Sequence, residues 1–226
     1  GLDPEILDAF AKFRNVEKVS SANLDSTIFS KKPGGTTVSG SLRICKLASI
    51  SVFVTGGIGG VHRDVSESMD VSSDLQAIKE SEIITVCAGP KTILDISKTY
   101  ELLETLSIPA FSYRQNNLPA FWYRDTKLRS THRVESPEAI AKIYSIARSI
   151  NCCNGLLLCN PIPKKYSLDQ MYLEPLILNG VMELKKANIT GKELTPSLLK
   201  YLVEKTNGKT LLSNIELIKN NALLGA

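Results

Sequence analysis

Two short apolar runs, each followed by a glycine-bearing loop, limit most strongly what this chain can fold into. Residues 52–54 (VFV) run into the loop 55–63 (TGGIGGVHR), and residues 83–87 (IITVC) run into the loop 88–91 (AGPK). Both apolar runs are typical of short buried strands. In open α/β sheets, ligands bind at the carboxyl ends of the strands, so we expect a site where these two loops meet.

Lys91 is the strongest candidate for chemistry in these loops. It follows the second run and precedes Thr92-x-x-Asp95, which predicts a helix that is capped at Thr92. The positive end of that helix dipole and partial burial would both lower the pKa of a lysine at this place. A neutral amine is what Schiff-base chemistry with an aldehyde requires. On local sequence alone, a solvated surface lysine is the commoner case.

Asp70 and Asp74 lie four residues apart, so a helix that begins at Val71 would carry both carboxylates on one face. Carboxylates with hydroxyls and waters suit magnesium or manganese, although acidic residues at a helix N-terminus are commonly just dipole partners. The loop 55–63 lacks the lysine of a P-loop and the glycine register of a dinucleotide fold. Its backbone N–H groups still offer a place for a phosphate.

Composition and charge exclude several classes of protein. The 226 residues suit one α/β domain, and the net charge of +4 is spread over interspersed acids and bases, which argues against a dedicated nucleic-acid binder. The five cysteines form no CxxC pair and predict reduced core residues in an intracellular, cytoplasmic protein. Two histidines argue against a histidine-rich zinc site, and we find no signal peptide or membrane-length apolar span.

The rest of the chain predicts an alternation of helices and strands. Further strands are expected at 16–20, 108–113 and 155–159. Helices are expected at 4–13, 92–106 and 168–188, after the loop 33–40, from 137 and from 212, and from a cap at Thr195 to 207, and a short helix or a turn is expected at 23–29. The aromatic stretch 118–123 is either core or a substrate wall. Asn160 and Asn214 either make turns and helix starts or point into a site.

The stretches 54–63, 69–75 and 86–95 together resemble the pseudouridine-5′-phosphate glycosidase family, also called the indigoidine synthase A-like family. Residues 118–121, 160–163 and 213–215 match later motifs of that family in the same order. The resemblance runs from Gly1 to about Ala222. It implies an α/β/α sandwich, a homotrimer and a divalent metal, typically manganese.

The resemblance also implies an activity and the residues that perform it. The reaction is reversible cleavage of the C–C glycosidic bond of pseudouridine 5′-phosphate, giving uracil and ribose 5-phosphate, and a fused or neighbouring sugar kinase is a possible partner. Lys91 would be the nucleophile that forms an imine with C1 of the opened ribose. Asp70 would hold the metal. The remaining pocket positions would be Ser72, Ser73 and Asp74 at the substrate, Lys18 and the Thr37–Val38 backbone at the phosphoribosyl end, and Thr55, His62 and Asn214.

The sequence departs from the family pattern in two ways. Pro90 stands where family members carry a small residue before the lysine. Family members also extend further at the N-terminus, where a glutamate acts as proton donor, so we expect residues 1–226 to form a single domain that lacks this segment. The alternative function is therefore an impaired phosphosugar- or metal-binding module. A Schiff-base aldolase of another kind is a third hypothesis, against which the absence of an eightfold βα pattern argues.

Overall fold

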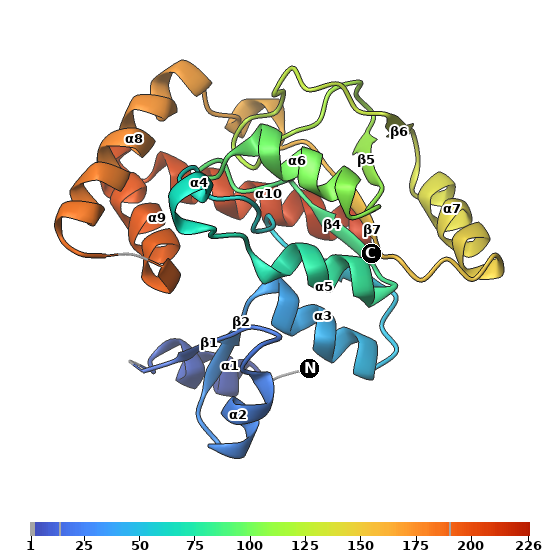
Figure 1. Ribbon diagram of the computed structural model, residues 1–226, viewed down its shortest axis with the longest axis horizontal. Coiled ribbons are helices and arrows are strands. Elements are labelled where there is room, and N and C mark those ends of the chain that lie inside the picture. The colour runs from blue at the N-terminus through green and yellow to red at the C-terminus, as the bar shows by residue number, and fades with distance from the viewer. Residues whose placement is uncertain (1–2, 14, 190) are drawn as a thin grey trace.

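The computed structural model describes residues 3–13, 15–189 and 191–226 (Figure 1). In chain order the elements are α1 (Pro4–Ala11), β1 (Glu17–Val19), α2 (Leu24–Phe29), β2 (Gly34–Thr36), α3 (Val38–Leu47), β3 (Val52–Val54), α4 (Val65–Ser68), α5 (Ser73–Ser81), β4 (Ile84–Cys87), α6 (Ile96–Thr105), β5 (Ala110–Tyr113), β6 (His132–Val134), α7 (Pro137–Ser149), β7 (Leu156–Cys159), the 3₁₀ turn η1 (Lys164–Tyr166), α8 (Gln170–Lys186), the 3₁₀ turn η2 (Gly191–Glu193), α9 (Leu194–Lys205) and α10 (Lys209–Gly225).

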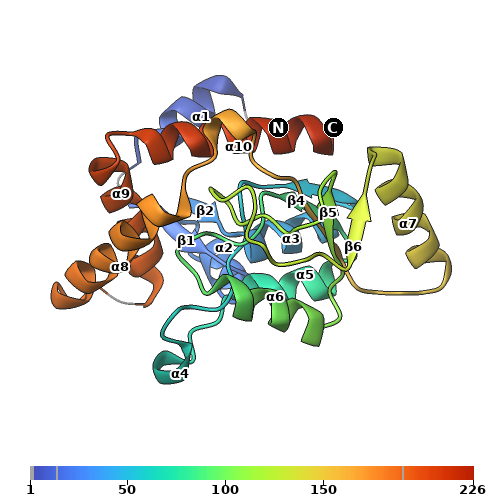
Figure 2. The same cartoon turned by 90° about the horizontal axis from the view of Figure 1, so that it is seen from above.

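The central sheet has the strand order β3-β4-β7-β5-β6, and every pairing within it is parallel. Helices α3, α5 and α6 lie on one side of the sheet and α10 lies on the other, while α7 packs beside β6 (Figures 1 and 2). The expected α/β/α sandwich is therefore confirmed. Among the helices of the described residues, none is long and apolar enough to cross a membrane.

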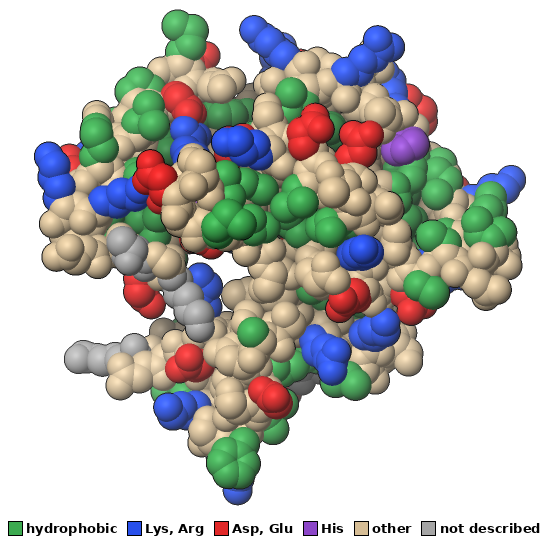
Figure 3. All heavy atoms as spheres, viewed as in Figure 1, with side chains coloured by type: hydrophobic (Ala, Val, Ile, Leu, Met, Phe, Trp, Pro, Cys, Tyr) green, Lys and Arg blue, Asp and Glu red, His purple; other side chains and the backbone are tan. Residues whose placement is uncertain are grey.

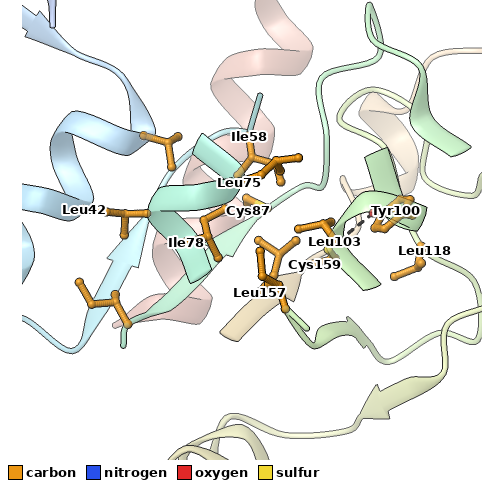
Figure 4. Close-up of a cluster of buried hydrophobic side chains, with 13 residues drawn as sticks. Leu42, Ile58, Leu75, Ile78, Cys87, Tyr100, Leu103, Leu118, Leu157 and Cys159 are labelled. Carbon is orange, nitrogen blue, oxygen red and sulfur yellow. Dashed lines mark hydrogen bonds between the residues drawn. The ribbon is translucent and has the colours of Figure 1, made fainter. Parts of the chain in front are cut away.

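Both faces of the sheet are buried, and alternate residues of each central strand supply the two cores. In β4, Cys87 faces the cluster between the sheet and the helices α5 and α6, which contains Ile78, Leu103 and Leu157 (Figure 4). Val86, one position earlier, belongs to the opposite cluster with α7. This alternation explains why the central strands β4 and β7 are apolar at every position but Thr85. A third cluster joins α8, α9 and α10 to the aromatic stretch 121–123, so those aromatics are core.

The N-terminal segment forms a small lobe below the main body in Figure 1, made of α1, β1, α2 and β2. Strands β1 and β2 form a separate two-stranded parallel sheet in which Lys18 is opposite Gly35. The lobe continues directly into α3, which packs on α5. An added Cβ on Gly40 would come within 2.7 Å of the Val19 carbonyl oxygen, so this glycine permits the close approach of α3 to β1.

Several predicted boundaries are wrong. The helix expected from Thr92 begins at Ile96, with Asp95 as its cap: the Asp95 Oδ1 accepts from the Lys98 backbone N–H at 3.0 Å. Helix α5 begins at Ser73, so Asp70 precedes it and the two carboxylates do not share a helical face. The last two helices begin at Leu194 and Lys209 rather than at a Thr195 cap and at 212.

The cysteine prediction is correct only in part. All five thiols are free of disulfides, and Cys87 and Cys159 lie in the core. Cys45 and Cys152 are half-buried, and Cys153 is exposed, because residues 150–154 form a surface connection between α7 and β7.

Candidate functional site

A cleft of ≈ 1080 Å³ opens between the small lobe and the main body, at the carboxyl ends of β3 and β4. Figure 3 shows the molecule hollowed between these two parts. The structure brings together nine of the predicted site residues in the lining of this cleft: Lys18, Thr37, Val38, His62, Asp70, Ser72, Ser73, Asp74 and Lys91. The site therefore lies where the two glycine-bearing loops meet.

The backbone around Lys91 is fixed by pairing with the loop that follows β3. The Lys91 N–H donates to the Ile58 carbonyl at 3.0 Å, and the Ile58 N–H donates to the Gly89 carbonyl at 3.2 Å. Gly89 has a φ of +92°, and an added Cβ would come within 2.3 Å of the Pro119 carbonyl oxygen, so only glycine fits there. Pro90 lies in this bridge, but the pairing uses its neighbours' groups, so proline removes no hydrogen bond.

The Lys91 side chain is half-buried at the cleft. Burial lowers the pKa of Lys91 below its ordinary value; the negative charge of Asp74 opposes this shift and the positive charge of Lys18 adds to it. No carboxylate of the described residues lies within 4 Å of its ammonium nitrogen, as an ion pair would require. The predicted direction and the predicted contribution of burial both agree with the structure, but α6 starts five residues after Lys91, so the predicted helix dipole is not adjacent.

Asp74 holds the floor of the cleft together. It is only 4% exposed, its Oδ1 accepts from the Ser39 N–H at 2.9 Å, and its Oδ2 accepts from the Gly59 N–H at 2.8 Å. A Cβ on Gly59 would come within 2.2 Å of the Ser72 Oγ, so the loop needs glycine to come this close. Asp74 therefore ties α3, α5 and the loop after β3 to one another.

The N-termini of α3 and α5 both open on the cleft. Thr37 caps α3, with its Oγ1 accepting from the Gly40 N–H at 3.4 Å, and Ser72 caps α5, with its Oγ accepting from the Asp74 N–H at 3.2 Å. The Ser39 hydroxyl links the two ends through contacts of 2.9 Å to Thr37 and 3.1 Å to Ser73. Two positive dipole ends beside Lys18 favour an anionic group at this end of the cleft.

His62 and Asp70 lie at the other side of the α5 N-terminus. The His62 Nε2 is 3.7 Å from the Asp70 Oδ2, and the His62 N–H donates to the Asp70 carbonyl at 3.0 Å. The described residues contain no group of three His, Cys, Asp or Glu side chains arranged around one point as a metal site requires. Asp70 is half-exposed to the cleft, so it fits a hard cation that keeps most of its waters.

Thr55 and Asn214 do not line this cleft. The Asn214 Oδ1 accepts from the indole N–H of Trp122 at 2.6 Å, and the Thr55 carbonyl accepts from the Asn221 side-chain amide at 2.9 Å. Asn160 likewise donates from its amide to the Asn220 carbonyl at 3.1 Å. These contacts hold α10 against the strand ends, so all three residues support the site from behind.

Sequence reasoning missed an ion pair at the cleft. Lys185 of α8 contacts Asp64 at 2.8 Å, and both residues line the cleft. The hydrogen bond from Lys185 lowers the pKa of Asp64, and the same bond raises the pKa of Lys185. The partners lie 121 residues apart, and neither stands in a motif, so no local pattern could have found the pair.

Comparison with known proteins is consistent with this geometry. The family model described as "Indigoidine synthase A like protein" matches residues 1–226. A protein of Staphylococcus aureus (strain MW2) is 42% identical and one of Petrotoga mobilis is 43% identical, in each case over all of this chain and 74% of the relative; both are named pseudouridine-5′-phosphate glycosidase.

Two solved structures share the fold over 100% of this chain and 74% of their own. One is an indigoidine synthase A-like protein from Thermotoga maritima, with a TM-score of 0.92 and 36% identity. The other is the prealnumycin C-glycosynthase AlnA in complex with ribulose 5-phosphate, with a TM-score of 0.91 and 29% identity. With a family match over its whole length and relatives above 40% identity, this chain belongs to the indigoidine synthase A-like family.

Proposed function

We infer that this protein is a pseudouridine-5′-phosphate glycosidase, an enzyme that cleaves the C–C glycosidic bond of pseudouridine 5′-phosphate to uracil and ribose 5-phosphate. Relatives of this name match all 226 residues at about 40% identity. The observation that carries the chemistry is Lys91, a half-buried lysine of lowered pKa in a cleft that also favours an anion.

Cleaving a C–C glycosidic bond requires a nucleophile at C1′ and a place for the electrons. In our proposal the Lys91 Nζ attacks C1′, a C–N bond forms as the C1′–O4′ bond breaks, and the ring oxygen takes up a proton. The nitrogen lone pair then forms the C=N bond of an imine as the C1′–C5 bond breaks, and uracil C5 takes up a proton. Water hydrolyses the imine, which releases ribose 5-phosphate and the free amine. The lowered pKa of Lys91 supports the first step, because only the neutral amine attacks.

The phosphate end of the substrate would bind where the cleft is most positive. Lys18 lies on the lobe, and the N-termini of α3 and α5 open beside it. Backbone N–H groups at Thr37 and Val38 and the hydroxyls of Ser72 and Ser73 are the donors available there. In this arrangement the uracil of the substrate would lie toward His62 and Asp70. Asp74 would hold together the floor of the cleft between the uracil end and the phosphate end.

We propose that a divalent cation, manganese by the family resemblance, is held by Asp70 through one carboxylate and its own waters. Support comes from the exposure of that carboxylate to the cleft and from the oxygen-rich surroundings. When bound, such an ion supplies positive charge beside oxygens of the substrate. The residues of this chain would still orient the sugar and hold its phosphate.

Borohydride trapping tests the proposal. The protein is mixed with ribose 5-phosphate and manganese, reduced, digested and analysed by peptide mass. We expect a reduced adduct on Lys91 in the wild type and none in Lys91→Met, and we expect uracil release from pseudouridine 5′-phosphate only in the wild type. A folded wild type that traps no adduct would refute the imine role. An adduct without uracil release would favour the binding-module alternative.

We also propose that the protein assembles as a homotrimer and acts after a kinase. Exposed apolar side chains on α10, among them Leu211, Leu212 and Ile218, support burial against another copy. A fused or neighbouring sugar kinase fits the substrate, because phosphorylation of the nucleoside is one reaction that supplies its 5′-phosphate. Light scattering at several protein concentrations tests the assembly, and a mass of one chain throughout would contradict it.

A further inference from the structure

Arg63 occupies an unusual place between two residues that line the cleft. His62 and Asp64 face the cleft, but the Arg63 side chain does not line it and borders two other hollows beside α8. Its Nε donates to the Ile93 carbonyl at 3.0 Å and its Nη2 to the Thr92 carbonyl at 2.9 Å. Its remaining donors form an ion pair with Glu174 of α8. The guanidinium thus binds the two residues that directly follow Lys91.

These two carbonyls explain why α6 starts late. In a helix capped at Thr92, the carbonyls of Thr92 and Ile93 would accept from the backbone N–H groups of Ile96 and Ser97. Arg63 donates to both carbonyls as they lie in the non-helical turn, and so stabilises this turn through residue 95 against extension of the helix. Thr92 and Ile93 are buried, and a buried carbonyl without a donor is costly. Without Arg63, extension of the helix toward Thr92 is the simplest way to satisfy them.

We propose that Arg63, held by Glu174, is a positioning residue that presents Lys91 to the cleft by keeping the segment 92–95 out of helix α6. The inference rests on the proposed function, in which Lys91 is the nucleophile. Extension of α6 would change the backbone dihedral angles next to Lys91 and turn its side chain relative to Asp74 and Lys18. Other bonds to this segment, such as the Asp95 N–H to the Val61 carbonyl at 2.9 Å, are neutral and do not compete for the two helix acceptors.

Glu174, which pairs with Arg63, also binds the aromatic core. Its carboxylate also accepts from the Tyr123 hydroxyl at 3.3 Å, so α8, the aromatic core and the Lys91 loop meet at one carboxylate. Burial, followed by the charge of Glu174, raises the pKa of Tyr123, so this hydroxyl keeps its proton and remains a donor. The position of Arg63 is therefore set from a helix more than 100 residues away in sequence.

The test uses the full chain with Arg63→Gln, Arg63→Lys and Glu174→Gln. We expect Arg63→Gln to slow adduct formation on Lys91 about 100-fold, the loss typical of a misplacement of about 1 Å, while the affinity for ribose 5-phosphate is unchanged. Arg63→Lys keeps the charge but lacks the fork that reaches both carbonyls, so it should also be slow. Glu174→Gln keeps the contacts of Arg63 with the Thr92 and Ile93 carbonyls, so its rate of adduct formation should fall less than that of the Arg63 variants.

Two readouts separate positioning from a general loss of stability. If Lys91 turns toward solvent, its pKa rises, so the pH at which trapping reaches half its maximum rate should move upward in the Arg63 variants. The backbone N–H groups of Ile96 and Ser97 should become more protected from hydrogen exchange, since they would gain helical partners. An unchanged trapping rate and pH profile in a folded Arg63→Lys would overturn the inference. A slower trapping rate with no change in the pH of half-maximal trapping or in the amide protection of Ile96 and Ser97 would overturn it as well. A wild type that traps no adduct would instead refute the proposed function.

Discussion

Replacing Asp74 by asparagine should destabilise this protein far more than its small change in size suggests. Both oxygens of the buried carboxylate accept from backbone N–H groups, at 2.9 Å from Ser39 and at 2.8 Å from Gly59. Asparagine offers one acceptor and one donor, so one backbone N–H would face another N–H group. Of the two hydrogen bonds that Asp74 accepts, one would be lost and the other would become a weaker bond to a neutral amide.

The contacts of Asp74 give the expected magnitude. Hydrogen bonds to charged groups contribute about 1.5–3 kcal/mol each and neutral ones about 1 kcal/mol. Losing one bond of Asp74 costs about 2 kcal/mol and converting the other to a neutral bond costs about 1 kcal/mol, so we expect the free energy of unfolding to fall by about 3 kcal/mol. That loss is a large fraction of the stability of an ordinary domain.

Equilibrium urea unfolding at pH 7 measures this loss, followed by the fluorescence of Trp122, the single tryptophan of the chain. Asp70→Asn is the matched control: the same substitution on a carboxylate that is 37% exposed should change the free energy of unfolding by no more than about 0.5 kcal/mol. If Asp74→Asn proves no more destabilising than Asp70→Asn, with equal denaturant dependence, Asp74 does not tie the three segments together.

Three other outcomes follow from the same contacts. Burial lowers the pKa of Lys91 below 10.5, so between the folded and unfolded pKa values the unfolded chain binds a proton that the folded chain has released. The wild type should therefore gain stability relative to Lys91→Met as the pH rises through that window to 10.5. Equal pH dependence of the two proteins in paired urea titrations would contradict this. Trp122→Phe removes the donor of the half-buried Asn214 Oδ1 and should cost about 1–2 kcal/mol in unfolding followed by circular dichroism. Asp70→Asn should raise the manganese concentration needed for half-maximal uracil release without lowering thermal stability, and an unchanged manganese dependence would exclude Asp70 as the ligand.

Local patterns predicted four of the five strands of the sheet because those strands are largely apolar, whereas β6, which carries His132 and Arg133, was not predicted. The expected strands at 52–54, 83–87, 108–113 and 155–159 are all found within a residue or two. Lys91 could be singled out for the same reason, since it follows a buried strand directly. Of the nine predicted residues that line the cleft, Lys91, Asp70 and Asp74 were candidates from local sequence, and the other six were assigned by the family resemblance. Spacing alone would not have gathered Lys18 and Lys91 at one cleft.

Boundaries that depend on distant residues were not predictable in this way. Thr92 has the local pattern of a helix cap, but Arg63, 29 residues earlier, takes its carbonyl. Asp70 and Asp74 have helical spacing, but a bridge between Val61 and Val71 keeps Asp70 extended. In each case a tertiary contact outweighs a local preference of about 1 kcal/mol.

The small lobe has a consequence for how the site responds to its ligand. Strands β1 and β2 pair over only three residues each, and a two-stranded sheet of this size has little stability of its own. We therefore expect the lobe to unfold locally at a lower free energy than the central sheet does. A molecule that contacts both Lys18 on the lobe and Lys91 on the body would suppress this local unfolding, so part of its binding free energy would appear as slower amide exchange in β1 and β2, far from the bond that breaks.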